Sequence, residues 1–268
     1  MAVTTTRRAV VAVRPDAATR SRPDDLAVEA PLSLVLDGTV IATLMRTPGH
    51  DVELAAGWLV VESGVVRRED VAGLAEVHAF DLEPDRVVIR LAAGVAPPRP
   101  RAYVTSAACG VCSVDVLDLE GTRPPGVPAA SEGWSVAGEV LAALPDAMRE
   151  HQRAFDRTGG VHAAAVATVD GELLVVREDV GRHNAVDKVV GRSLLEGPFP
   201  LTDHLLVVSG RVSFELVQKA VAAGLSGIVA VSAPSSLAVD LAREHGLLLA
   251  GLVRGARMNL YAGADAVT

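Results

Sequence analysis

Alternating apolar and polar residues predict a small α+β unit in the first hundred positions. Residues 32–36 and 40–44 alternate on either side of Asp37-Gly38, a dipeptide typical of tight hairpin turns. A second pair of alternating runs between residues 75 and 91 predicts another hairpin. Between the two hairpins, the spacing of the apolar residues predicts a helix that ends at Gly64.

The pattern changes in the second half of the chain. A helix is expected from residue 135 to 155, bent or restarted at Pro145. After a hairpin at Asp170-Gly171, strands alternate with polar loops and helices three times, and a last strand covers 247–253. Such alternation is typical of an α/β fold with a largely parallel sheet.

Parallel strands place the loops at their carboxyl ends along one edge, where open α/β sheets bind ligands. Arginines beside helix N-termini and glycine turns favour phosphate. The residues expected at this edge are Arg182, His183, Ser209, Arg211, Ser213, Ser235, Ser236, Arg254 and Arg257.

Composition suggests where the chain divides. Residues 95–101 are rich in proline, and residues 121–133 are rich in proline, glycine and serine, as in exposed connecting segments. We therefore predict a flexible tail at 1–22, a small α+β domain at 23–105, an exposed loop at 106–134 and an α/β cofactor-binding domain at 135–268.

Charge and hydropathy exclude several classes of protein. The formal net charge of −8 argues against a nucleic-acid-binding protein, and no window of about twenty residues lacks charge, which argues against a membrane span. Arg7-Arg8 precedes an apolar run that Arg14 interrupts too early for an export signal. We expect a cytoplasmic protein. Only two lysines stand beside many arginines, which suits phosphate recognition or reflects genome composition.

Both cysteines lie in one C-x-x-C motif, Cys109 and Cys112, between the two proline-rich segments. An exposed thiol can carry a persulfide, and a second thiol nearby can attack it, expel sulfide and leave a disulfide. Cys109 is then the carrier and Cys112 the resolving thiol. No basic residue lies between Arg101 and Arg123, so sequence neighbours do not acidify these thiols.

Other uses of the C-x-x-C motif remain open. A zinc site needs two further ligands, which only scattered histidines such as His162 and His183 can supply. A thioredoxin-like redox pair opens a helix, whereas this pair lies in an irregular segment. We predict no bound metal.

The charged segment 178–188 has two interpretations. His183 with Asp187, and Asn184 with Lys188, are spaced i, i+4 and can pair on a helix surface. Alternatively, Gly181-Arg182 lies where a strand gives way to a helix and binds a ligand. Ser213 and Ser235 are expected to be helix caps.

Several motifs together resemble the formate dehydrogenase accessory sulfurtransferase family, FdhD, over residues 30–262. The motifs are Thr158-Gly159-Gly160-Val161-His162-Ala163-Ala164, the segment Glu178 to Lys188, Ser209-Gly210-Arg211, Cys109-Gly110-Val111-Cys112, Pro48 to Gly57 and Arg254 to Tyr261. Ser113 departs from the family pattern, in which a second glycine follows the C-x-x-C.

The resemblance implies a sulfurtransferase that takes sulfur from a cysteine desulfurase. By this likeness Cys109 holds the persulfide and passes sulfur to the molybdenum bis(molybdopterin guanine dinucleotide) cofactor of formate dehydrogenase. A homodimer is also implied. The alternatives are a cofactor-binding chaperone that transfers no sulfur and a zinc-binding regulatory protein. The residues implied to contact the cofactor are Leu252, Val253, Arg254, Gly255, Ala256 and Arg257.

The family's second domain also resembles the cytidine deaminase fold, which implies a three-layer domain with a mixed, largely parallel sheet. Zinc deaminases need the motifs H-x-E and P-C-x-x-C. The matching positions here begin at His162 and Pro234 and lack the glutamate and both cysteines. Deaminase chemistry is therefore not expected, and the pocket is left for another ligand.

Overall fold

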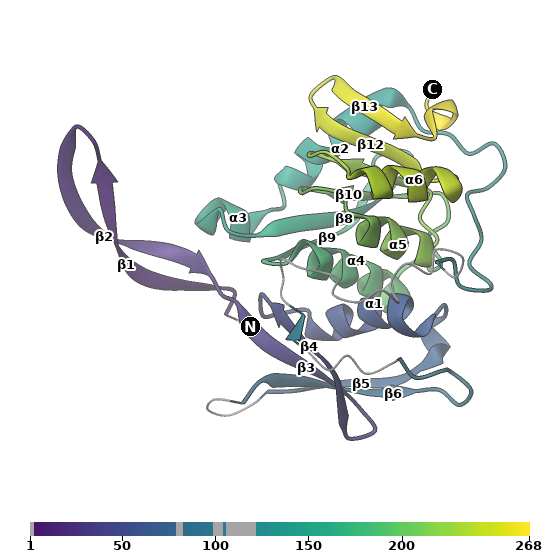
Figure 1. The fold of residues 1–268 in the computed structure, drawn as a ribbon, viewed down its shortest axis with the longest axis horizontal. Helices are drawn as coiled ribbons and strands as arrows, with labels where there is room; N and C mark the ends of the chain where they lie inside the picture. The colour runs from purple at the N-terminus through teal and green to yellow at the C-terminus, as the bar shows by residue number, and fades with distance from the viewer. Residues whose placement is uncertain (1–2, 79–82, 99–103, 106–121) are drawn as a thin grey trace.

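The computed structural model describes residues 3–78, 83–98, 104–105 and 122–268 (Figure 1). A six-stranded sheet forms the centre of the C-terminal part, in the order β13-β12-β11-β10-β8-β9. Its strands are β8 (His162–Thr168), β9 (Leu173–Asp179), β10 (His204–Val208), β11 (Gly227–Ala230), β12 (Leu248–Arg254) and β13 (Arg257–Ala262).

The sheet is mixed, as predicted. Neighbours β10, β11 and β12 are parallel, whereas β8 runs antiparallel to both β9 and β10, and β13 runs antiparallel to β12. Strands β9, β10, β11 and β12 therefore all point the same way, and their carboxyl ends share one edge. Strand β13 was not predicted from the sequence.

Helices cover both faces of this sheet, which gives the three layers that we expected. One face carries α2, and the other carries α4, α5 and α6. The apolar residues of β8 point alternately into the two cores, since Ala163 and Ala165 join the α2 side and Ala164 and Val166 join the other. The helices are α2 (Gly138–Arg149), α3 (Arg153–Thr158), α4 (Arg182–Glu196), α5 (Phe214–Ala222) and α6 (Ser236–Glu244).

The helix predicted from residue 135 to 155 is wrong in its limits. Helix α2 continues through Pro145, and the chain leaves the helix only after Arg149 before α3 begins at Arg153. Proline disrupts a helix by removing one amide hydrogen bond and crowding the preceding turn, and near the middle of this short helix both effects are tolerated.

The N-terminal part adds a five-stranded sheet in the order β5-β6-β3-β4-β7 and one long helix. The predicted hairpins are present as antiparallel pairs β3–β4 and β5–β6. The elements are β3 (Ala30–Leu36), β4 (Thr39–Arg46), α1 (Asp51–Ser63), β5 (Val71–Val77), β6 (Asp85–Leu91) and β7 (Val104–Thr105), with a short 3-10 helix at Arg68–Asp70. A second short 3-10 helix, Ala264–Ala266, follows β13 in the C-terminal part.

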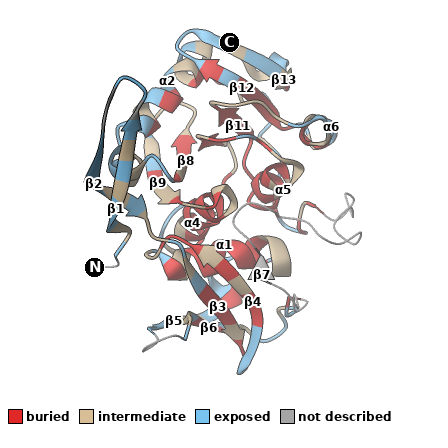
Figure 2. Cartoon of the chain, turned by 60° about the vertical axis from the view of Figure 1, so that its left-hand side comes forward, coloured by how far each residue is buried: buried red, intermediate tan, exposed pale blue. Residues whose placement is uncertain are grey.

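One apolar core joins the two parts of the molecule. Helix α1 lies between the five-stranded sheet and α4, and its buried side chains belong to the same cluster as those of α4 and α5 (Figure 2). The α+β region and the α/β region therefore pack as one body, although the sequence indicated a boundary between them.

Two glycines allow α1 and α4 to cross at very short range. A Cβ atom built on Gly57 would lie 1.9 Å from the carbonyl oxygen of Asp187, and one built on Gly191 would lie 1.8 Å from that of Glu53. Both partners are backbone atoms, which cannot rotate away. The crossing therefore requires glycine at each position.

The predicted flexible tail is instead mostly a hairpin. Strands β1 (Thr5–Arg14) and β2 (Ala17–Ala27) pair along their length and project from the body (Figure 1). Arg157 of α3 binds Asp25 of the hairpin at 3.3 Å. Neither face of β1 is fully buried, since Val11 and Val13 on one face are exposed and Val10 and Ala12 on the other are only partly buried.

Glu53 gives the fold a specific acid sensitivity. Burial raises the pKa of Glu53, but hydrogen bonds from Arg177 and His50 outweigh this effect and lower it to about 2. Arg177 on β9 binds both carboxylate oxygens, at 2.6 and 2.8 Å. The pKa of Glu53 is lower in the folded than in the unfolded state, so the ionised carboxylate stabilises the fold. This stabilisation is complete above the unfolded pKa and is lost as the pH falls from about 5 toward 2.

We therefore expect Arg177→Gln to reduce the stability of the protein at neutral pH and to flatten the loss of stability below about pH 5. Urea unfolding at a series of pH values measures both effects. Arg192→Gln, on the exposed side of α4, is the matched control. Parallel pH profiles for Arg177→Gln and the wild type would contradict this assignment.

Candidate functional site

A cavity of about 670 Å³ lies at the carboxyl edge of the six-stranded sheet. Helix α2 forms one wall, the turn after α3 forms a second, and the ends of β10, β11 and β12 form the base. Its volume is typical of small-molecule sites. The lining residues are Pro145, Asp146, Met148, Arg149, Gln152, Phe155, Gly159, Gly160, Val161, His162, Ser209, Val231, Val253, Arg254 and Gly255.

The cavity includes half of the segment predicted to bind the cofactor. Val253, Arg254 and Gly255 line it, whereas Leu252, Ala256 and Arg257 do not. A register shift between Gly251 and Arg254 separates the side chains of this segment, so Val253 is buried and Leu252 points outward. The remaining three residues are exposed or partly exposed on the same turn.

Leu252 has a φ of 55°, which is unfavourable for a residue with a side chain. Its amide donates to the carbonyl oxygen of Ser232 at 3.2 Å, which holds the conformation. Such local strain gathers at binding sites. The turn itself passes through Gly255, whose φ of 54° lies in the left-handed region that glycine adopts without strain.

Arg254 of β12 pairs with Arg257 of β13 on opposite sides of this turn. Their guanidinium groups are available to a ligand. Within the described residues neither forms an ion pair. The acids that might have bound them are used elsewhere, since Glu178 accepts the amides of Ala154 and Phe155 at 2.8 Å and Asp179 is fully buried. Arg254 therefore brings a cation to the cavity, and Asp146 of α2 brings a carboxylate to the same lining.

His162 and Ser209 bring polar atoms to the base of the cavity. The Ser209 hydroxyl accepts from the amide of Ala163 at 2.9 Å, which fixes the loop after β10 against β8. Burial lowers the pKa of His162, and the charges of Arg182, His183 and Arg211 lower it further. The imidazole is therefore mainly neutral at pH 7.

The charged residues of segment 178–188 do not form the surface pairs that their spacing suggested. Asp179 is fully buried and accepts from the amides of Thr47 and Gly181, at 3.1 and 2.8 Å, and from Lys188 at 2.7 Å. Asp187 pairs with Lys219 at 2.6 Å. The i, i+4 interpretation is therefore wrong for this segment.

This buried network ties the loop after β4 to the start of α4. Lys188 also donates to the carbonyl oxygen of Thr47 at 2.8 Å, and Asn184 donates to that of Met45 at 2.7 Å. Buried charges need this degree of pairing. Sequence analysis missed the network because Met45 and Thr47 lie 132 or more residues before their partners Asp179, Asn184 and Lys188.

The two predicted serine caps have different outcomes. Ser235 caps α6, since its hydroxyl accepts from the amide of Ala238 at 3.3 Å. Ser213 stands at the cap position of α5, but its hydroxyl lies 3.3 Å from Nε2 of His183 and makes no capping bond. His183 also binds Glu215 at 2.8 Å.

Cys109 and Cys112 lie outside the described residues. Strand β7, which ends at Thr105, pairs in parallel with β4 at the edge of the five-stranded sheet. The described structure therefore does not test the role of either thiol.

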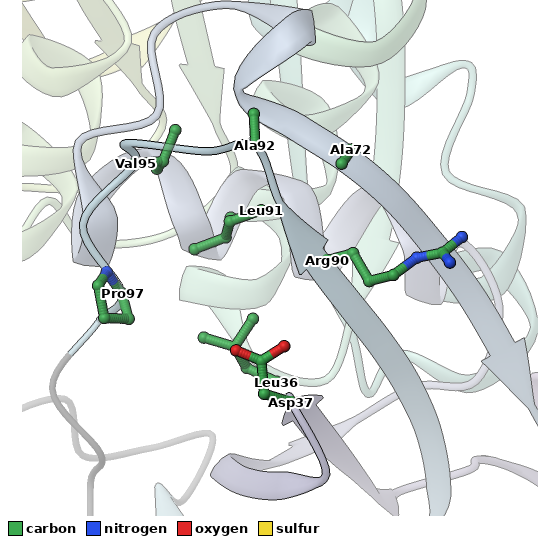
Figure 3. A pocket seen from close by; sticks show the side chains of 8 residues that line it. All are labelled: Leu36, Asp37, Ala72, Arg90, Leu91, Ala92, Val95 and Pro97. Atoms are coloured by element: carbon green, nitrogen blue, oxygen red, sulfur yellow. The ribbon is translucent and has the colours of Figure 1, made fainter.

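A second hollow, of about 600 Å³, lies beside the five-stranded sheet (Figure 3). Leu36, Leu91, Val95 and Pro97 contribute apolar walls, and Arg90 extends away from them toward β5. A Cβ atom built on Gly73 would lie 3.1 Å from the Arg90 head group, so this cation is packed against a neighbouring strand. Asp37 brings a carboxylate to the hollow beside Leu36, so Asp37 and Arg90 are its two charged lining residues.

No three His, Cys, Asp or Glu side chains in the described ranges are grouped to hold a metal ion. None of the helices built from these residues is long and apolar enough to cross a membrane.

The fold and the site define an α/β protein with a cavity at the carboxyl edge of its central sheet, lined by both apolar and charged residues. Comparison with known sequences gives the family. The chain belongs to the FdhD/NarQ family, whose model matches residues 27–268.

Curated relatives match over nearly their whole length. A protein of Streptomyces coelicolor named sulfur carrier protein FdhD is 49% identical over 98% of this chain and 95% of its own. A protein of the same name from Mycobacterium tuberculosis is 45% identical over 92% of this chain and 93% of its own. The predicted family membership is thus confirmed.

A solved structure supports the fold independently. It is the crystal structure of a candidate formate dehydrogenase accessory protein from Desulfotalea psychrophila, with a TM-score of 0.78 at 22% identity. The match covers 99% of this chain and all of the other. At this identity it is evidence for the fold alone. The more specific likeness to cytidine deaminase stays a prediction.

Proposed function

We propose that this protein is a cytoplasmic sulfurtransferase that serves formate dehydrogenase. The observation that carries the proposal is the pair Cys109 and Cys112, the chain's only thiols, in a chain that matches sulfur carrier proteins over nearly its full length. A cysteine desulfurase is the proposed sulfur donor. The proposed acceptor is the molybdenum bis(molybdopterin guanine dinucleotide) cofactor, and the proposed assembly is a homodimer.

Loading of the carrier is a simple displacement. The Cys109 thiolate attacks the terminal sulfur of the donor's persulfide, a new sulfur–sulfur bond forms, and the donor cysteine leaves as a thiolate. In release, the Cys112 thiolate attacks the Cys109 sulfur, and hydrosulfide leaves toward the acceptor. The product is a Cys109–Cys112 disulfide, which an external dithiol must reduce before the next cycle.

The cavity at the sheet edge suits the nucleotide end of this acceptor. Arg254 supplies a planar cation for phosphate oxygens, and the Gly255 turn lets a ligand approach the backbone closely. As the substrate, the cofactor supplies the molybdenum atom that receives sulfur. The residues of this chain bind and orient it.

The proposal is tested by intact-mass analysis. Purified protein is incubated with a cysteine desulfurase and cysteine, and one added sulfur atom per chain is expected. A chain that gains no sulfur but still binds the cofactor would favour the chaperone alternative. Stoichiometric zinc in the purified protein would favour the regulatory alternative.

We expect GDP alone to bind the cavity and Arg254→Ala to weaken binding about tenfold or more, because a charge-assisted hydrogen bond to phosphate is lost. Arg257→Ala should weaken binding less, since Arg257 does not line the cavity. Calorimetric titration measures both affinities. The control is Arg243→Ala. In the wild type, the Nε of Arg243 donates to the Tyr261 carbonyl oxygen. Unchanged affinity in Arg254→Ala would remove the turn from the site.

A further inference from the structure

The hairpin of β1 and β2 projects from the body of the molecule as a two-stranded ribbon, which we call the arm (residues 5–27) (Figure 1). Its base is held by Asp25, which binds Arg157 of α3 at 3.3 Å and Arg7 of β1 at 3.1 Å. An isolated two-stranded hairpin is only marginally stable in water, and such hairpins gain stability by packing against another surface. Both strands are also edge strands, whose free backbone groups can pair with another chain. The arm therefore has the form of an element that binds a partner.

The two faces of the arm differ in their side chains. Ala9, Val11 and Val13 share one face, on which Pro23 and Ser21 of β2 lie opposite the first two. Val11 and Val13 are 64% and 72% exposed, so this apolar strip faces water over most of its area. An apolar strip with a polar border is typical of a surface that packs against a partner. The residues of the opposite, basic face include Arg8, Arg20 and Arg22.

The arm and the rest of the chain have net charges of opposite sign. Residues 5–27 hold five arginines and three aspartates, a net charge of +2, whereas the whole chain carries −8, so the residues outside the arm carry −10. The ribbon is thin, so its arginines lie within about 10 Å of any surface that the apolar face touches, which is close to one Debye length at physiological salt. A second copy of this chain therefore offers a body whose charge attracts the arm.

The area of the arm favours a partner that reciprocates the contact. The part of β1 beyond Arg7 is about 23 Å long, and the ribbon is about 10 Å wide, so one face covers about 230 Å². One arm on one partner would bury about 460 Å² over both surfaces, which is less than a stable interface needs. Two arms exchanged about a two-fold axis would bury about 900 Å² by these faces alone, and the borders of each arm add to this area. Reciprocal exchange thus approaches the area of about 1,200 Å² at which stable interfaces begin.

We propose that the arm of one copy of this chain docks on the body of a second copy, which docks its own arm on the first in the same way. Val11 and Val13 pack against the partner, and the basic face draws the arm toward the partner's negatively charged body. The proposal rests on the proposed function only in naming the interface of its homodimer, and it does not require sulfur transfer. Because the interface is small and partly electrostatic, the dimer should dissociate on dilution and at high salt.

Sedimentation velocity of the full chain, at a series of protein concentrations, measures the dissociation constant of the dimer. The double variant Val11→Asp/Val13→Asp should raise this constant about tenfold or more, because two valines that the partner covers become charged. The matched control is Val40→Asp/Val77→Asp, which changes two exposed valines of the five-stranded sheet and should behave as wild type. All four positions are exposed, so the body of each variant should fold as in the wild type.

Hydrogen exchange and salt dependence locate the contact on the arm. Raising the concentration of the wild-type protein should slow amide exchange in residues 5–27, and Val11→Asp/Val13→Asp should remove this effect. Arg20→Gln/Arg22→Gln should weaken the dimer by a smaller factor and should make its dissociation constant less dependent on salt, because two attracting charges are lost.

Three results would overturn the proposal: a wild-type chain that is monomeric at every concentration, a dimer that only the Val40→Asp/Val77→Asp control dissociates, or a dimer whose arm exchanges as fast as in the monomer. Slow exchange in the arm that requires added cysteine desulfurase would assign the arm to another protein and would also overturn it. By intact mass, each variant should still gain one sulfur atom. Absence of this sulfur in the wild type would contradict the sulfur-transfer proposal and leave the arm contact standing.

Discussion

Replacing Cys109 by alanine will abolish the addition of sulfur to this chain and the ability of the chain to mature formate dehydrogenase. Cys109 is one of only two thiols in the chain, and the other, Cys112, is proposed to resolve the persulfide rather than to carry it. The measurements are intact mass after incubation with a cysteine desulfurase and enzyme activity in a strain that lacks the native carrier. Calorimetry with GDP should remain unchanged.

The matched control is Cys112→Ala, which keeps the carrier thiol. This variant should still gain one sulfur atom, but release should be slow without an added thiol, because no second thiol attacks the persulfide. Full maturation by Cys109→Ala would show that the persulfide mechanism is wrong. Equal failure of both variants to gain sulfur would assign the carrier role to the pair.

Replacing Gly57 by alanine should cost about 3 kcal/mol or more of stability, at the upper end of overpacking effects. The added Cβ atom meets the backbone of Asp187 at 1.9 Å, so α1 and α4 must move apart and open the shared core. Urea unfolding measures the free energy, and insoluble expression would be the extreme form of the same result.

Gly138→Ala is the control for this substitution. Gly138 is the first residue of α2, and a Cβ atom there would meet its nearest neighbour at an ordinary 3.7 Å. We expect stability close to wild type, since alanine is also the better helix former. A Gly57→Ala protein within about 0.5 kcal/mol of wild type would contradict the tight crossing.

Local patterns were enough for most of the α/β region. The predicted alternation of strand, loop and helix is present, since β10 spans His204–Val208 and α5 follows at Phe214–Ala222. These elements combine clear apolar periodicity with well-marked ends. The hairpin turn at Asp37-Gly38 was equally readable, because both residues adopt the positive φ that the turn requires.

The same reasoning failed for the charged residues of α4, because their partners lie outside the helix. The sequence shows Asp187 and Lys188 at spacings that suit surface pairs, but Asp187 binds Lys219 and Lys188 binds Asp179 and Thr47. Nothing local distinguishes a buried charge from an exposed one until its partner is known. Burial of α4 on two sides, against the sheet and against α1, decides the outcome.

The candidate site was partly predictable for the same reason. The strand–loop–helix pattern placed Ser209 and Arg254 at the correct edge, and both line the cavity. The wall from α2, including Met148 and Arg149, was not predicted, because no periodicity shows which face of a sheet a preceding helix will cover.

The glycine crossing also bears on how far sulfur must travel. With α1 and α4 interlocked through their backbones and enclosed in one core, the five-stranded sheet and the six-stranded sheet are packed into one body. This packing fixes the separation between the edge strand β7 and the cavity. In the sulfur transfer that we propose, closure of one half of the molecule upon the other therefore does not bring the thiol and the acceptor together.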